Sequence, residues 1–179
     1  SERNGATYQP LGFAGDNQHV YMAKGEGGKP ESVVLLDMQT REEVQLSSNG
    51  TVDPPGLVWS SDRKTLLGVL YEDGIPYWDW VAPDHPEARA YAGLVKAFAG
   101  KAVSFLRPSE DGRLLAMRVY SDKQPPEAFL YDRETKKATY LAGSMDWIKS
   151  KDMSPMQPIS FKARDGLQRR GGQDWRRDH

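Results

Sequence analysis

Few residues of this 179-residue chain could carry out hydrolysis. A serine hydrolase needs a serine that is activated by a histidine, which an acidic residue orients. The histidines here are His19, His85 and His179, and there is no cysteine. His19 begins an expected strand, His85 lies in a loop and His179 is the last residue, while no serine stands in a Gly-x-Ser-x-Gly pattern. We therefore expect no catalytic residue in this chain, which is not predicted to be an enzyme as it stands.

Metal and phosphate chemistry finds no better support. Residues 25–30 lack the spacing of a phosphate-binding loop and have a proline where a serine or threonine would hold magnesium, so they are interpreted as a hairpin loop. Asp16, Asp62 and Asp111 resemble cation ligands, but their places in successive turns explain them without an ion. The absence of cysteine excludes disulfides and Cys-ligated zinc. We expect no cofactor and no metal.

An aromatic cluster is the strongest candidate for binding. Tyr77, Trp78 and Trp80 offer large and stiff surfaces that could contact a peptide. The competing interpretation, which we favour, is that they alternate along a strand and pack between sheets. Asn49 begins an Asn-Gly-Thr glycosylation sequon, but Asn-Gly is first of all a turn signal.

Charge and hydropathy exclude several partners. The 24 Lys and Arg residues nearly balance 25 Asp and Glu, so the net charge of −1 gives no general attraction to nucleic acid or to an anionic membrane. The longest purely aliphatic run, residues 33–36, is far shorter than the roughly 20 residues of a membrane helix. We expect neither nucleic acid nor membrane as a partner, and the compartment stays open.

An internal repeat indicates which elements position these residues. Residues 13–22 align with residues 59–68 at a displacement of 46, and residues 107–116 follow 48 residues later, which puts the first and third copies 94 apart. Independently, residues 35–42 align with residues 130–137 at a displacement of 95. Each block combines an Asp-containing turn with an apolar segment, a pattern typical of hairpins.

The repeat predicts an all-β chain. Its short apolar segments favour strands; they are residues 19–23, 33–36, 66–71, 114–120 and 128–131. A period of about 40–50 residues with four strands per unit is typical of a propeller blade. We therefore predict about three four-stranded antiparallel blades of an incomplete β-propeller, with one short helix at residues 90–98. Open blade edges would allow oligomerisation or aggregation.

Several segments together carry a resemblance to a known family. They are residues 56–62, 100–106, 111–113, 119–122, 130–135 and, above all, residues 156–167. These segments resemble the propeller of bacterial serine peptidases of the prolyl oligopeptidase family, in particular acylaminoacyl-peptidase-like and dipeptidyl-aminopeptidase-like members. Residues 156–167 resemble the junction at which the chain leaves the propeller and begins the first hairpin of an α/β-hydrolase domain.

The resemblance implies a domain organisation. Residues 1–150 would form a partial propeller and residues 151–168 the junction to an α/β-hydrolase domain, which is missing together with its Ser, His and Asp. Residues 169–179 are polar and lack strand alternation, and they are predicted to be a disordered or aberrant tail. Their four arginines and Trp175 would suggest contact with nucleic acid, but Asp174 and Asp178 interrupt them, so we favour the unstructured tail.

The resemblance also implies a function for the parent protein, which would be a periplasmic or cytoplasmic bacterial enzyme that hydrolyses peptides. This chain would be its non-catalytic part and would control the access of peptides to the missing hydrolase domain. Its partners would be that domain and peptides. The residues leave one alternative open, a free-standing β-repeat module that binds proteins or peptides.

Overall fold

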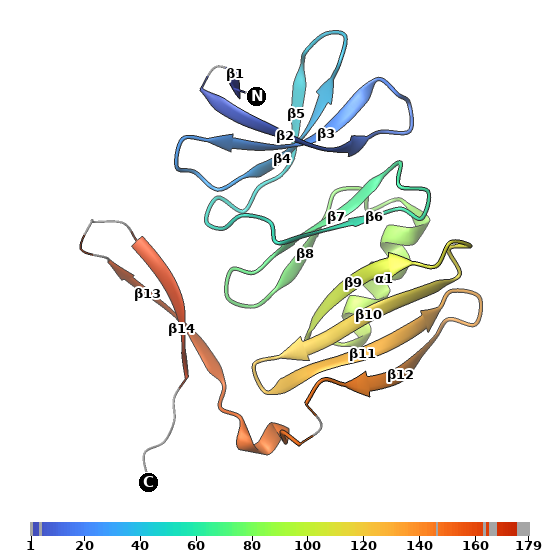
Figure 1. Ribbon diagram of the computed structural model, residues 1–179, viewed down its shortest axis with the longest axis vertical. Helices are drawn as coiled ribbons and strands as arrows, with labels where there is room; N and C mark the ends of the chain where they lie inside the picture. The colour runs from blue at the N-terminus through green and yellow to red at the C-terminus, as the bar shows by residue number, and fades with distance from the viewer. Residues whose placement is uncertain (1, 4, 146, 163, 165–167, 175–179) are drawn as a thin grey trace. The chain divides into compact units, whose positions relative to one another are not determined.

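The computed structural model describes residues 2–3, 5–145, 147–162, 164 and 168–174 of the chain (Figure 1). The chain divides into two compact units, Ser1–Ala97 and Phe98–His179, which are described separately below. Every pair of neighbouring strands is antiparallel. The predicted all-β class is confirmed, with three blade-like sheets in series along the chain.

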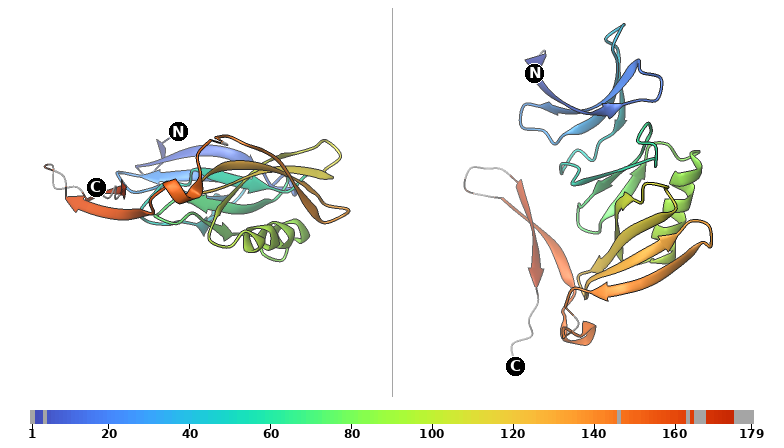
Figure 2. Two further views of the ribbon diagram at one scale, coloured as in Figure 1. Left: turned by 90° about the horizontal axis from the view of Figure 1, so that it is seen from below. Right: turned by 45° about the vertical axis from the view of Figure 1, so that its right-hand side comes forward.

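The first unit contains two of these sheets. The first sheet has the strand order β1-β2-β3-β4-β5 and consists of β1 (Glu2–Arg3), β2 (Ala6–Phe13), β3 (His19–Glu26), β4 (Ser32–Asp37) and β5 (Glu43–Ser47). The second sheet consists of β6 (Gly56–Trp59), β7 (Leu66–Tyr71) and β8 (Tyr77–Trp80). The helix α1 (Pro86–Ala97) follows β8 and packs against β7 (Figure 2). The second sheet thus has three strands and not the four that were predicted.

The start of α1 has identifiable causes. Pro86 suits the first helical position, where its fixed φ is helical and no backbone N–H is needed. The backbone N–H of Glu87 donates to Nδ1 of His85 at 3.2 Å, so His85 caps the helix. The Glu87 carboxylate accepts the hydroxyl of Ser61 at 2.8 Å, which ties the helix to a turn of the second sheet. The helix predicted at residues 90–98 is present but begins earlier.

The second unit contains the third sheet and a hairpin. The third sheet has the order β12-β11-β10-β9, with β9 (Ala102–Pro108), β10 (Leu114–Ser121), β11 (Gln124–Asp132) and β12 (Lys137–Gly143). A 3-10 turn, η1 (Ser150–Asp152), precedes a hairpin of β13 (Met156–Lys162) and β14 (Gln168–Asp174). Residues 169–174 of the predicted tail are therefore part of a strand, and residues 175–179 lie outside the described residues. The domain boundary at residue 150 stays a prediction.

Three hairpin turns share one backbone geometry, although their sequences differ. Each turn has a residue with a positive φ at the same place; these residues are Asn17 (54°), Arg63 (58°) and Gly112 (70°). The first N–H of each turn donates to the carbonyl five positions later; the pairs are Ala14 and His19 at 2.9 Å, Ser60 and Thr65 at 2.9 Å, and Ser109 and Leu114 at 2.8 Å. The turns are therefore equivalent at displacements of 46 and then 49 residues.

Strand register extends this equivalence to entire sheets. Met22 lies opposite Pro10 and Val34 in the first sheet, and Met117 lies opposite Phe105 and Phe129 in the third. Both sheets also have register shifts at equivalent places: at Leu11 and Leu106 in the first long strand, and at Leu46 and Leu141 in the last strand. The first and third sheets are thus the same blade at a displacement of 95 residues.

This register corrects the predicted alignment by one residue. The predicted displacement of 94 between the first and third turns is wrong, because the third turn follows the second by 49 residues and not 48. His19 therefore corresponds to Thr65 and Leu114. Its predicted match to Arg113 is wrong, and Gln18 takes that place. The Gln18 amide donates to Asp37 at 2.8 Å, as the Arg113 guanidinium donates to Asp132 at 2.8 Å.

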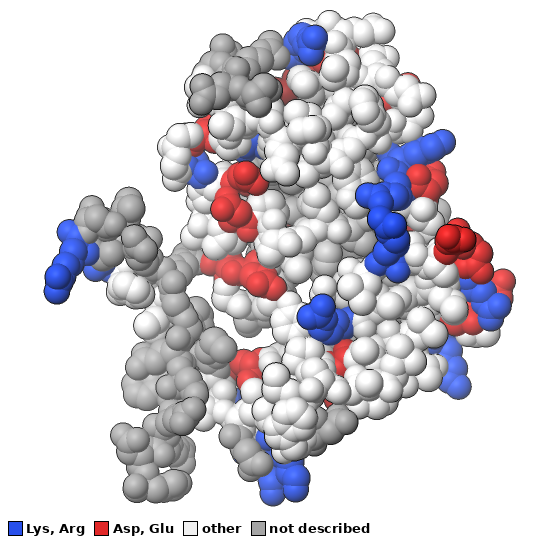
Figure 3. Space-filling model, viewed as in Figure 1, with Lys and Arg blue, Asp and Glu red and all other residues white. Residues whose placement is uncertain are grey.

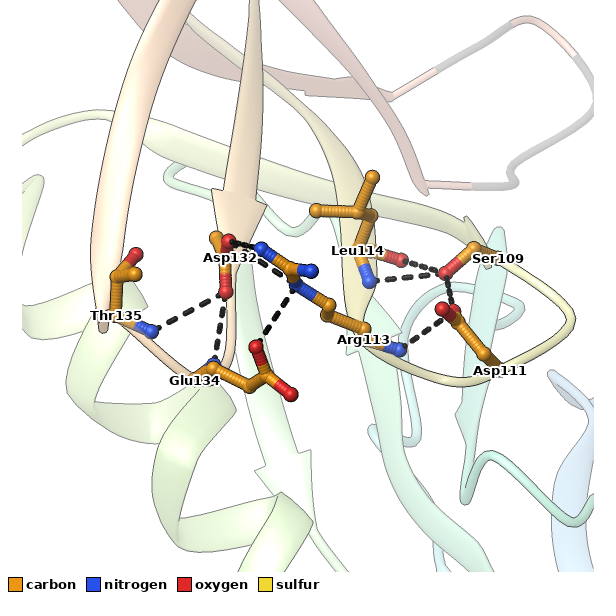
Figure 4. A network of polar contacts seen from close by, with 7 residues as sticks. All are labelled: Ser109, Asp111, Arg113, Leu114, Asp132, Glu134 and Thr135. Carbon is orange, nitrogen blue, oxygen red and sulfur yellow. Dashed lines mark hydrogen bonds and ion pairs between the residues drawn. The ribbon is translucent and has the colours of Figure 1, made fainter.

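The side chains of the third turn show what fixes this geometry (Figure 4). The hydroxyl of Ser109 accepts the N–H of Leu114 at 2.9 Å and donates to Asp111 at 2.5 Å. The same Asp111 carboxylate accepts the N–H of Arg113 at 3.0 Å. Asp132 accepts the N–H groups of Glu134 and Thr135 in the next turn, as the Asp-x-x-Thr pattern predicts. Short acidic side chains therefore supply the bonds that the turning backbone lacks.

The best-defined core lies between the first and second sheets. It contains Tyr21, Val33, Leu66, Val69 and Tyr71, all of them buried. Trp59 of the second sheet meets the Tyr21 ring edge to face, with ring centroids 5.2 Å apart. A side chain at Gly12 would begin 3.0 Å from Trp59, so the tryptophan needs a glycine beneath it.

Candidate functional site

Strand β8 carries the predicted aromatic cluster and distributes it over two faces. Trp78 and Trp80 are two residues apart and share one face, where their rings stack with centroids 5.7 Å apart. Gly68 lies opposite Trp80, and a Cβ at Gly68 would come within 2.9 Å of the indole. Tyr77 lies on the opposite face. The structure thus brings together the two tryptophans and separates them from the tyrosine.

On the Tyr77 face a polar network joins the first and second sheets. Ser47, which is buried at the end of β5, donates its hydroxyl to Asp79 at 2.6 Å. The Ser47 hydroxyl also lies 2.9 Å from the Tyr71 hydroxyl. Burial raises the pKa of Tyr71, so this phenol stays protonated and able to donate. The network satisfies groups that packing of the two sheets removes from water.

Tyr77 is the exposed member of the cluster, with 44% of its surface accessible. Its ring lies 5.7 Å from that of Tyr71, and its hydroxyl accepts the side-chain N–H of Asn49 at 2.9 Å. The other end of the Asn49 amide accepts the N–H groups of Thr51 and Val52, each at 3.0 Å. This arrangement confirms the turn at the Asn-Gly pair. The hydrogen bond from Asn49 also orients the Tyr77 ring.

His19 has the chemistry of a base but is not placed to act as one. Its Nδ1 lies 2.6 Å from the Asp16 carboxylate and its Nε2 lies 3.6 Å from that of Asp37. Backbone N–H donors from His19 and Gln18, and then the imidazole, lower the pKa of Asp16 to about 2. Because both ring nitrogens face carboxylates, neither is directed at a hydroxyl nucleophile. His85 caps a helix, and His179 lies outside the described residues.

A hollow at the first sheet is lined mainly by polar residues. It has a volume of about 230 Å³ and is lined by Lys24, Glu26, Lys29, Pro30, Ser32, Gln45, Ser48 and Gly50. The Lys24 ammonium forms ion pairs with Glu43 and, at 2.9 Å, with Glu26. Hydrogen bonds to these carboxylates raise the pKa of Lys24, so the amine stays charged and is not a nucleophile at neutral pH. Within the described residues, no group of three or more His, Asp or Glu side chains is placed to hold a metal ion.

Charges of both signs are interspersed over the face drawn in Figure 3, and no broad basic field is visible on it. No helix in the described part of the chain is long and apolar enough to cross a membrane.

Comparison with known proteins supports the fold of the chain but does not assign it to a family. No family model and no curated protein matches the chain. Among solved structures, the prolyl oligopeptidase B of Galerina marginata superposes with a TM-score of 0.52 at 13% identity, over 94% of this chain and 24% of that protein. At this identity the similarity shows a β-propeller fold and not a family.

Two further structures are more distant. TolB from Acinetobacter baumannii has a TM-score of 0.46 at 14% identity, over 93% of this chain and 40% of that one. A structure from a study of two prolyl endopeptidases has a TM-score of 0.45 at 11% identity, over 80% and 23%. The chain therefore spans about a quarter of the two peptidases and less than half of TolB.

Proposed function

We propose that this chain is a non-catalytic part of the β-propeller of a serine peptidase of the prolyl oligopeptidase family. In that enzyme it would limit the access of peptides to an α/β-hydrolase domain outside this chain. The observation that carries the proposal is a set of sheets that repeat in turn, bulge and register, together with their similarity to a prolyl oligopeptidase over 94% of the chain. The resemblance of residues 156–167 to the family's junction supports it.

The close packing of the first sheet on the second suits a propeller that excludes folded proteins from an active site. Trp59 and Tyr21 interlock at its centre, and Ser47 and Asp79 bond across it. Separating two sheets joined in this way would expose buried apolar area and break the hydrogen bond between Ser47 and the partly buried Asp79 carboxylate. A propeller of this kind would exclude large substrates by shape, while short peptides enter elsewhere.

The gene on both sides of this segment tests the proposal most simply. We expect a continuous reading frame that encodes His-Gly-Gly and, beyond it, Gly-x-Ser-x-Gly followed by Asp and His in that order. A frame that encodes neither motif would overturn the proposal and leave the free-standing binding module as the remaining reading.

The chain itself should be inert toward serine-directed reagents. We expect no labelling of the purified 179-residue chain by a fluorophosphonate probe, since His19 faces two carboxylates and His85 caps a helix. Labelling that a serine substitution abolishes would contradict the non-catalytic assignment.

Within the proposed function, Tyr77 is the member of the aromatic cluster that we assign to peptide contact. Its ring is exposed and is oriented by Asn49, whereas Trp78 and Trp80 are only partly exposed. We expect Tyr77→Ser to weaken binding of a fluorescein-labelled, proline-containing peptide by about tenfold, as loss of an aromatic anchor does. Val44→Ser, which removes an exposed apolar side chain from another strand, is the control. Equal affinities of the two variants would remove Tyr77 from the site.

A further inference from the structure

The side-chain amide of Asn49, in the segment between β5 and β6, is held at both ends. Its Oδ1 accepts the backbone N–H groups of Thr51 and Val52, each at 3.0 Å. Its Nδ2 donates to the Tyr77 hydroxyl at 2.9 Å. Gly50 follows Asn49 and has a positive φ of 76°. All of these residues belong to the first unit, so one compact part of the chain holds them together.

The glycine leaves this amide open to attack. A backbone nitrogen that attacks Cγ of the preceding asparagine closes a five-membered succinimide ring, and a side chain on the attacking residue hinders its approach. Gly50 has no side chain, and in the described part of the chain no atom beyond its neighbours lies within 4 Å of where a Cβ would be. The reaction is intramolecular, so the nucleophile and its target are already held side by side.

From this geometry we infer that Asn49 is a site of self-modification, at which the fold promotes loss of the side-chain amide as ammonia. Gly50 supplies the nucleophile, and the N–H groups of Thr51 and Val52 form an oxyanion hole. Tyr77 is the acid that protonates the leaving nitrogen. The inference is independent of the proposed peptidase function, because the reaction needs only these residues and water.

The first step makes Cγ of Asn49 tetrahedral. The Gly50 nitrogen gives its proton to solvent and bonds to Cγ, while an electron pair of the Cγ–Oδ1 double bond moves onto Oδ1. The two backbone N–H groups that already donate to Oδ1 stabilise the negative charge that develops there. Because these donors are in place before the reaction, the charge forms without reorganisation of the turn.

The second step expels the nitrogen. Once Cγ is tetrahedral, Nδ2 has a lone pair, and the Tyr77 hydroxyl beside it donates its proton to that lone pair. The Cγ–Nδ2 bond breaks, ammonia leaves, Oδ1 becomes a succinimide carbonyl, and Tyr77 regains a proton from solvent. Water then opens the ring at either carbonyl to give aspartate or isoaspartate. Overall, one amide and one water become one carboxylate and one ammonium ion.

The product differs from the original chain next to Tyr77. A carboxylate at residue 49 has no N–H to donate, so the bond that orients the Tyr77 ring is lost or reversed in direction. The net charge of −1 also becomes more negative by one. Isoaspartate lengthens the backbone by one carbon atom at a turn whose two N–H donors require the present geometry.

A second Asn-Gly pair in the same chain, Asn4 and Gly5, gives an internal reference. The whole chain is kept in mildly alkaline buffer, once folded and once in concentrated urea, and peptide mapping by mass spectrometry follows amide loss at both asparagines. We expect Asn49 to react at least about tenfold faster in the folded chain than in urea. In urea, where the fold is absent, Asn49 and Asn4 should react at similar rates.

Tyr77→Phe removes the hydroxyl and keeps the ring. We expect this variant to slow the reaction at Asn49 at least about tenfold. Tyr140→Phe is the matched control, because Tyr140 is 50% exposed and Tyr77 is 44% exposed; it should leave the rate unchanged. Circular dichroism establishes that both variants are folded. An amide at Asn49 that survives longer in the folded chain than in urea would overturn the inference, and so would equal rates for the two variants.

Discussion

The first and third sheets are the same blade built twice, and they differ in what their faces present. In both, a methionine at the centre of the second long strand pairs with the same positions on either side, and both have bulges at the same leucines. Yet Tyr21 is buried against a neighbouring sheet, whereas the equivalent Ala116 lies on a partly open face. Turns and bulges therefore set the register, and the residues on the faces determine which neighbours a blade accepts.

The opposite faces of these two sheets differ as well. Met117 and Val119 of the third sheet are fully buried, but Lys24 stands where the third sheet has Val119. The Lys24 amine lies 5.9 Å from the centre of the Tyr8 ring and pairs with Glu43, so polar side chains cross this side of the first sheet.

The largest expected effect comes from exchanging the residues at the centre of this comparison. Tyr21→Ala should lower the free energy of unfolding by about 3–5 kcal/mol, because it removes a buried ring and leaves Trp59 without its partner. Ala116→Tyr, at the equivalent place on the open face, should cost less than about 1 kcal/mol. Urea unfolding followed by tryptophan fluorescence measures both values. Equal losses for the two substitutions would mean that the two faces are covered alike.

The buried network gives the next effect. Ser47→Ala should cost about 1–3 kcal/mol, because it leaves the Asp79 carboxylate and the Tyr71 hydroxyl without a shared partner. The equivalent residue of the third sheet is Ala142, and Ala142→Ser should change stability by less than about 0.5 kcal/mol. Thermal unfolding by circular dichroism compares the two variants. If Ser47→Ala left the stability unchanged, the network would not stabilise the first unit.

The turns should show a smaller difference. Ser109→Ala removes the hydroxyl that accepts from Leu114 and donates to Asp111, at an expected cost of about 1 kcal/mol. The first turn has Ala14 at this place, and there Asp16 accepts the N–H of His19 directly at 3.0 Å. Ala14→Ser should therefore bring no more than about 0.5 kcal/mol. A clear increase in the urea midpoint of Ala14→Ser would contradict the view that Asp16 already supplies, in the first turn, the hydrogen bond that Ser109 supplies in the third.

The pH dependence of the first turn should be the smallest effect. The pKa of Asp16 is lowered to about 2 from 3.8, mainly by backbone N–H donors. A lowered folded-state pKa stabilises the fold above the unfolded value, and this stabilisation disappears as the pH falls from about 4 to about 2. The difference in stability between wild type and Asp16→Asn should therefore shrink over that window. A difference that is constant with pH would show that the carboxylate charge has no part in the turn.

The sequence predicted the repeat because Asp16, Asp62 and Asp111 mark equivalent turns, and a short acidic side chain is what such a turn requires. For the first and third turns, however, the alignment predicted from the sequence has a displacement of 94, one residue less than the displacement of 95 in the structure. The third turn holds Gly112 at the positive φ where the first has Asn17, so similarity of residue types there did not fix the alignment. Only the strand register distinguishes the two alignments.

For the candidate site, strand alternation alone could have separated Tyr77 from Trp78 and Trp80. The role of Ser47 could not have been foreseen, because it bonds to Asp79, 32 residues away, and a single serine carries no pattern. The three-stranded second sheet was also missed. The helix that follows β8 is announced by Pro86 and Glu87, but Gly93 weakened the helical pattern over residues 90–98.

The central claim is that the first and third sheets are one blade repeated at a displacement of 95 residues. Nuclear Overhauser contacts between backbone protons of β9 and β10 test it directly. The account predicts that Met117 contacts Phe105 and that Arg118 contacts Ser104 across the strands. Contacts that place Ala116 opposite Ser104, as a displacement of 94 would require, would contradict it.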